Sequence, residues 1–67
     1  MELSARNQLK GRVTAVTTGS VMAEVTVDIG GQEMVAAITR GSVERLKLQI
    51  GDQVTVIVKS TEVMLGK

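Results

Sequence analysis

The segment from Ser4 to Gly11 contains the residues of this chain that are best equipped to bind a ligand. It places a hydroxyl, a guanidinium, an amide and consecutive backbone N–H groups directly ahead of a β-type pattern. These groups donate hydrogen bonds, and none of them is an activated nucleophile, a general base or a metal ligand. Donors without such groups indicate a site that holds an anion, rather than one that transforms a substrate.

Two further segments, Thr39-Arg40-Gly41-Ser42 and Lys59-Ser60-Thr61, also combine small hydroxyl residues with a cation. Taken singly, the three segments are better explained as a strand lead-in, a helix cap and a β-bulge, respectively. Taken together, they suit a compact tetrahedral oxyanion, because hydroxyl and N–H donors could surround it beside a positive charge. In this interpretation Lys59 supplies charge, and the O–H donors are Ser4, Ser60, Thr39 and Ser42.

A fourth candidate is Gly19-Ser20-Val21, which lies between two β-patterns. At a hairpin tip near a symmetry axis, the N–H groups of several subunits could converge on one anion. The same three residues also fit an ordinary β-turn, and from the residues alone the turn is favoured.

The composition excludes several kinds of catalysis. The chain has no His and no Cys, so it offers no catalytic triad, no thiolate and no soft metal site. Glu24 and Asp28 share one face of a predicted strand, but they are too far apart to form a carboxylate pair unaided. No nucleotide-binding glycine pattern occurs, so we expect no enzyme, no organic cofactor and no directly ligated metal cation.

The apolar residues predict self-association. The 67-residue chain has eleven Val and no aromatic residue, and it has no Cys for a disulfide. One small domain of this composition, residues 1–67, lacks large side chains for its core. We therefore expect a homo-oligomer in which copies of the chain bury one another's apolar surface.

The charges are mixed along the chain and sum to +1, which is atypical of nucleic-acid tails and membrane-binding helices. A nucleic-acid-binding barrel would stack bases on aromatic side chains, which are absent, so this alternative ranks last. The chain contains no apolar run long enough to predict a membrane span or the core of a signal peptide. We therefore expect a cytoplasmic protein.

Alternating apolar residues predict an all-β fold, a five-stranded OB-like barrel with one short helix between strands 3 and 4. In the first strand, Leu9, Val13 and Ala15 are expected on one face; in the helix, Ser42 is the expected N-cap, with Val43 and Leu46 facing the core. In the second strand, one face is expected to carry Val21, Ala23, Val25, Val27 and Ile29. The expected strands cover residues 8–17, 21–29, 33–39, 53–59 and 62–65, and the expected helix covers residues 42–47.

The segments Ser4 to Gly11, Ser42-Val43-Glu44-Arg45-Leu46 and Val58-Lys59-Ser60-Thr61-Glu62-Val63-Met64 resemble those of the molbindins. These are small molybdenum-pterin-binding (Mop-type) proteins made of one molybdate-binding TOBE-like domain. The resemblance covers essentially the whole chain. It implies a hexamer, a trimer of dimers, that binds molybdate or tungstate between subunits.

The resemblance also implies which residues bind the oxyanion. One kind of site would use Ser4, Ala5, Arg6, Lys59 and Ser60 of one subunit with Thr39 and Ser42 of a neighbour. A second kind, near a three-fold axis, would use Gly19, Ser20 and Val21. The pair Arg40-Gly41 departs from the more acidic or amide-bearing pair usual in the family, and it adds a positive charge beside the first site.

These observations support one leading hypothesis, a cytoplasmic oxyanion-binding protein for molybdenum storage or homeostasis. The alternative is an effector-sensing module that acts in trans with a molybdate-responsive regulator or transporter. In either case the anion would stay chemically unchanged.

Overall fold

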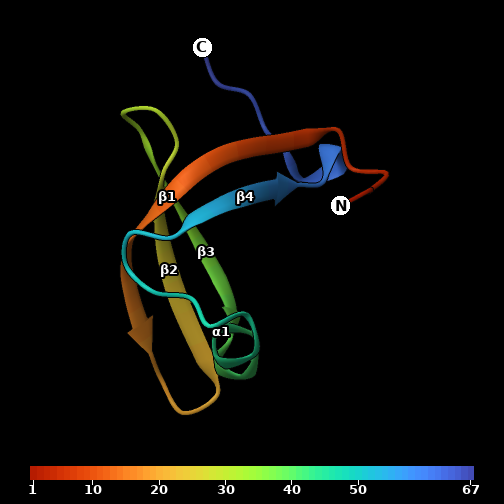
Figure 1. Cartoon of the computed structure of the whole chain (residues 1–67). Helices are drawn as coiled ribbons and strands as arrows, with labels where there is room; N and C mark the ends of the chain where they lie inside the picture. The colour runs from red at the N-terminus through yellow and green to blue at the C-terminus, as the bar shows by residue number, and fades with distance from the viewer.

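A long curved strand, β1 (Asn7–Thr18), runs through the whole fold (Figure 1). The computed structural model describes all 67 residues. The remaining elements, in chain order, are β2 (Met22–Asp28), β3 (Glu33–Thr39), α1 (Arg40–Leu46), β4 (Gln53–Val58) and the short 3-10 helix η1 (Ser60–Glu62).

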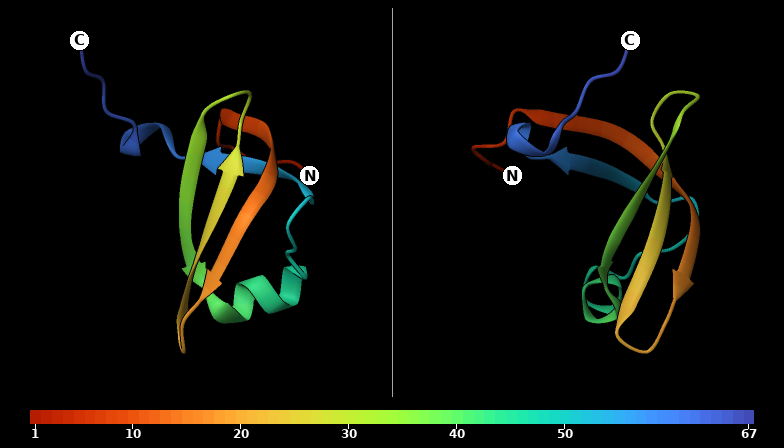
Figure 2. Two further views of the ribbon diagram at one scale, coloured as in Figure 1. Left: turned by 90° about the vertical axis from the view of Figure 1, so that its left-hand side faces the viewer. Right: turned by 180° about the vertical axis from the view of Figure 1, so that it is seen from behind.

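The four strands form one antiparallel sheet in the order β3-β2-β1-β4. The two halves of β1 have different neighbours. Its first half pairs with β4, from Asn7 opposite Val58 to Arg12 opposite Gln53. Its second half pairs with β2, and the sheet curls where β1 passes from one neighbour to the other (Figure 2).

A β-bulge interrupts the alternation of β1. The register shifts between Val13 and Ala15, so Val13 lies opposite Val27 while Ala15 lies opposite Thr26. The extra residue turns Val13 into the core and Ala15 to the outer face. The prediction that Val13 and Ala15 share one face was therefore wrong.

The core is small and consists largely of valine. Strand β2 supplies most of it, since Ala23, Val25 and Val27 are each 3% exposed, as the alternating pattern predicted. Val21 was expected on the same face, but it precedes β2 and is 69% exposed. Strand β3 turns its Met34, Ala36 and Ile38 inward and leaves Val35 exposed.

Helix α1 begins two residues earlier than predicted. Its N-cap is Thr39, not Ser42, and it ends at Leu46, where Lys47 adopts a left-handed conformation. Val43 is buried as expected, but Leu46 is 60% exposed rather than facing the core. The helix lies against the ends of β2 and β3 (Figure 2).

The expected fifth strand is absent. After β4 the chain turns through η1, where the N–H groups of Glu62 and Val63 donate to the carbonyls of Lys59 and Ser60. This turn directs the following residues away from the sheet, where they meet no strand edge, and Met64 and Leu65 are more than 90% exposed. The fold is thus an all-β curled sheet of four strands with one short helix, and the prediction of a five-stranded barrel was wrong in its strand count.

Candidate functional site

Five of the predicted binding residues lie together at one end of the sheet. The pairing of Asn7 with Val58 places the end of the N-terminal segment beside the end of β4. The side-chain amide of Gln8 donates to the carbonyl of Ala5 at 2.7 Å, which folds this segment over the start of β1. We call the group the cationic cluster; it consists of Ser4, Ala5, Arg6, Lys59 and Ser60.

The cationic cluster is open to solvent and positively charged. The side chains of Ser4, Arg6, Lys59 and Ser60 are exposed. Neither Arg6 nor Lys59 forms an ion pair, since the chain's ion pair lies elsewhere. Two cations that form no ion pair can attract an anionic ligand, and the Glu62 carboxylate, which lines the neighbouring pocket, offsets part of their charge.

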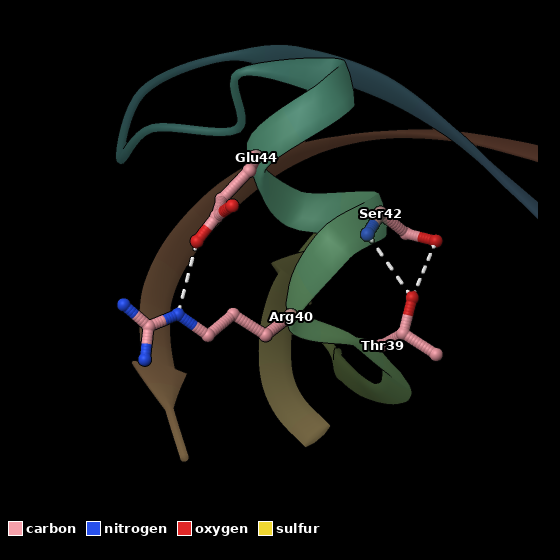
Figure 3. A network of polar contacts seen from close by, with 4 residues as sticks. All are labelled: Thr39, Arg40, Ser42 and Glu44. Atoms are coloured by element: carbon pink, nitrogen blue, oxygen red, sulfur yellow. Dashed lines mark hydrogen bonds and ion pairs between the residues drawn. The ribbon is translucent and has the colours of Figure 1, made fainter. Parts of the chain in front are cut away.

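Thr39 and Ser42 meet at the start of α1 and form what we call the hydroxyl pair (Figure 3). The Oγ1 of Thr39 accepts a hydrogen bond from the backbone N–H of Ser42 at 3.0 Å. The same oxygen lies 2.8 Å from the Ser42 Oγ, so the two hydroxyls share a hydrogen bond. The first of these contacts is the N-cap of α1, which fixes the position of both side chains.

The shared hydrogen bond limits what the hydroxyl pair can offer to a ligand. Each hydroxyl has one proton. Whichever hydroxyl donates within the pair, one proton is used there and one remains. While this bond persists, the pair can therefore give an anion one O–H donor, where the sequence alone suggested two.

The fourth candidate segment, Gly19-Ser20-Val21, lies beside the hydroxyl pair. The backbone N–H of Arg40 donates to the carbonyl of Val21 at 2.8 Å, and Met22 pairs with Thr39 across the sheet. All three residues of the segment are exposed. One end of the molecule thus carries both the hydroxyl pair and the residues predicted for the second kind of site.

The cationic cluster and the hydroxyl pair lie at opposite ends of the molecule (Figure 1). A pocket beside the cluster contains Met34, at the start of β3, together with Asn7 and Val58. Thr39 is five residues further along β3, which corresponds to about 17 Å in an extended strand. Since hydrogen bonds require contacts of about 3 Å, all seven residues of one chain cannot surround one oxyanion.

Arg40 is placed differently from the expectation. Its side chain leaves α1 on the side away from the hydroxyl pair, and its Nε lies 3.0 Å from Oε1 of Glu44 (Figure 3). The positive charge that the sequence suggested beside the site is therefore paired with a carboxylate. Spacing of i, i+4 within a helix could have predicted this ion pair.

Comparison with known proteins identifies the family. The model of the TOBE domain matches residues 3–65. A relative from Haemophilus influenzae, named a probable molybdenum-pterin-binding protein, is 43% identical over 67 residues, covering 98% of this chain and 97% of the relative. The chain belongs to the TOBE domain family.

Two solved structures resemble this TOBE domain over nearly its whole length. A molybdate-binding protein from Sporomusa ovata has a TM-score of 0.96 and 46% identity, with complete coverage of both chains. The protein ModG, described as a cytoplasmic molybdate-binding protein and solved with molybdate bound, has a TM-score of 0.84 and 36% identity. That match covers 97% of this chain and 53% of ModG.

No group of three or more His, Cys, Asp or Glu side chains is arranged to hold a metal cation. Neither helix has the length and hydropathy needed to span a membrane.

Proposed function

We propose that this TOBE domain binds molybdate or tungstate as an intact oxyanion, at sites completed by two copies of the chain. The observation that carries the proposal is the separation of the cationic cluster from the hydroxyl pair at opposite ends of one molecule. The cluster would supply charge from Arg6 and Lys59, and the hydroxyl pair of a neighbouring copy would supply an oriented O–H donor. The names of the relatives support molybdate as the anion.

The surface of the single chain supports self-association. A globular monomer of 7.1 kDa is expected to expose about 4,100 Å², whereas this chain exposes 5521 Å². The excess of about 1,400 Å² is larger than the roughly 800 Å² that each partner buries in a standard interface. Only five of 67 residues are buried, and several large apolar side chains remain exposed. We propose a homohexamer, a trimer of dimers, as the assembly.

We further propose that binding serves molybdenum storage or homeostasis in the cytoplasm and involves no catalysis. Donors of this kind hold an anion without changing its bonds. A second kind of site, formed by Gly19, Ser20 and Val21 near a three-fold axis, would bind a further oxyanion through backbone N–H groups.

Calorimetric titration of the chain with molybdate, tungstate and sulfate tests the proposal. We expect saturable binding of the first two anions and weaker binding of sulfate, because sulfate has the same charge and shape but is smaller. An absence of heat with molybdate and tungstate at micromolar protein would refute it.

Light scattering tests the assembly separately. Six copies of the 7.1 kDa chain have a mass of about 43 kDa. A 7.1 kDa species that binds molybdate with full affinity would refute the inter-subunit site, because it would have no neighbour to complete it.

A further inference from the structure

The chain's ion pair lies at the end of the molecule that carries the hydroxyl pair. Arg40 and Glu44 are in contact at 3.0 Å on the exposed surface of α1, with side chains that are 51% and 65% exposed. Arg40 directly follows Thr39, yet its guanidinium is directed away from the hydroxyls (Figure 3). The cationic cluster at the other end keeps Arg6 and Lys59 without any such partner.

We propose that Glu44 withholds Arg40 from the bound oxyanion and thereby sets the affinity of the site. This inference rests on the proposed function, since it concerns the same anion. A guanidinium is a strong partner for oxyanions because its N–H groups match two oxygens at once. Without the Glu44 carboxylate, the long and exposed Arg40 side chain is free to turn toward the hydroxyl pair and contact the anion there.

The size of the effect follows from the exposure of the pair. Interactions between exposed charges are weak in water, so removal of Glu44 should tighten anion binding by about two- to fivefold. Molybdate and sulfate carry the same charge, so both affinities should rise by the same factor. The ratio between them should therefore stay constant, because cavity size, which Arg40 does not alter, sets that ratio.

Two variants with matched structural effects test the inference. Glu44→Gln and Arg40→Gln both remove the ion pair from α1, but only Glu44→Gln leaves a free cation. Titration calorimetry with molybdate and with sulfate should show tighter binding by Glu44→Gln and no gain by Arg40→Gln, which frees the Glu44 carboxylate and leaves no cation to contact the anion. The gain should shrink when the salt concentration is raised from about 20 to 200 mM, because salt screens exposed charges.

The double variant Arg40→Gln/Glu44→Gln separates the role of Arg40 from that of the Glu44 charge. We expect it to bind as the wild type does. If it bound as tightly as Glu44→Gln, the Glu44 carboxylate would act by repelling the anion, and the inference would be wrong.

Two other results would also overturn the inference. Equal shifts in the two single variants would indicate a structural effect through α1, and an unchanged Glu44→Gln would show that Arg40 is not withheld. In both cases wild-type binding of molybdate would keep the proposed function intact. A wild type that bound no molybdate would overturn the proposed function together with this inference.

Discussion

Replacement of Gly11 by Ala should destabilise the fold, because β1 lies too close to the end of β2 at this position to leave room for a Cβ atom. A Cβ on Gly11 would lie 2.5 Å from the Val27 Cγ1, 2.8 Å from the carbonyl oxygen of Asp28 and 3.1 Å from the Ile29 Cγ2. Val27 is 3% exposed and packs in the core, so it cannot move aside. Gly11 lies where β1 changes neighbours from β4 to β2, a position at which a glycine allows close approach of the backbone.

Two effects of opposite sign set the magnitude. Ala loses less backbone entropy than Gly on folding, which would stabilise the variant by about 0.5–1 kcal/mol. Overpacking in a rigid core costs about 1–3 kcal/mol. We therefore expect a net loss of about 1–2 kcal/mol in the free energy of unfolding, or about 4–16 °C in melting temperature for a domain of this size.

Far-UV circular dichroism can follow the melting, since the chain has no Trp or Tyr. Protein concentration must be held constant, because the stability of an oligomer depends on it. Gly66→Ala is the matched control, as nothing lies within 4 Å of its added Cβ. A Gly11→Ala variant that melted at or above the wild-type temperature would show that the fold accommodates a Cβ atom at this position, and would refute the prediction.

Three further substitutions separate the site from the scaffold. Lys59→Ala should weaken molybdate binding by about ten- to a hundredfold in calorimetry and leave the oligomer mass unchanged; equal weakening in Lys10→Ala, an exposed cation outside the cluster, would refute the assignment. Thr39→Ala should lower the unfolding free energy by about 1 kcal/mol through loss of the N-cap, while Thr39→Ser should melt near the wild type; equal losses would contradict the capping role. Val25→Asp should abolish the β-sheet signal in circular dichroism, because it buries an unpaired charge in the core; a folded variant would contradict that placement.

The sequence predicted those elements whose residues alternate cleanly. In β2, polar residues separate Ala23, Val25 and Val27, so one face had to be buried, and it is. In β1 the same reasoning failed after Val13. The β-bulge adds one residue to the strand, so each later side chain points to the opposite face from the one that simple alternation predicts. Leu46 was assigned to the core from its spacing, but α1 covers only the end of a small sheet and leaves it exposed.

The residue types of the two groups in the candidate site could be predicted from the sequence, but the distance between the groups could not. Hydroxyl and basic residues identified both the cationic cluster and the hydroxyl pair, and β1–β4 pairing brought the first together. The predicted N-cap, Ser42, was wrong because Thr39, three residues earlier, carries an equivalent hydroxyl that can cap a helix start. Strand β3 covers residues 33–39 as predicted, but the distance between the two groups also depends on its direction and its place in the sheet, which only the folded chain reveals.

The division of β1 between two neighbours has a consequence for biosynthesis. Residues 19–46 contain the β2–β3 hairpin and α1, whose contacts are local, so the end with the hydroxyl pair can form early. The other end must wait for β4, since Arg12 pairs with Gln53, 41 positions later. A chain leaving the ribosome from its N-terminus would thus acquire its hydroxyl donors first, and Arg6 and Lys59 would come together only after β4 has emerged. Truncation within β4 should therefore remove the positive end of the molecule while sparing the other.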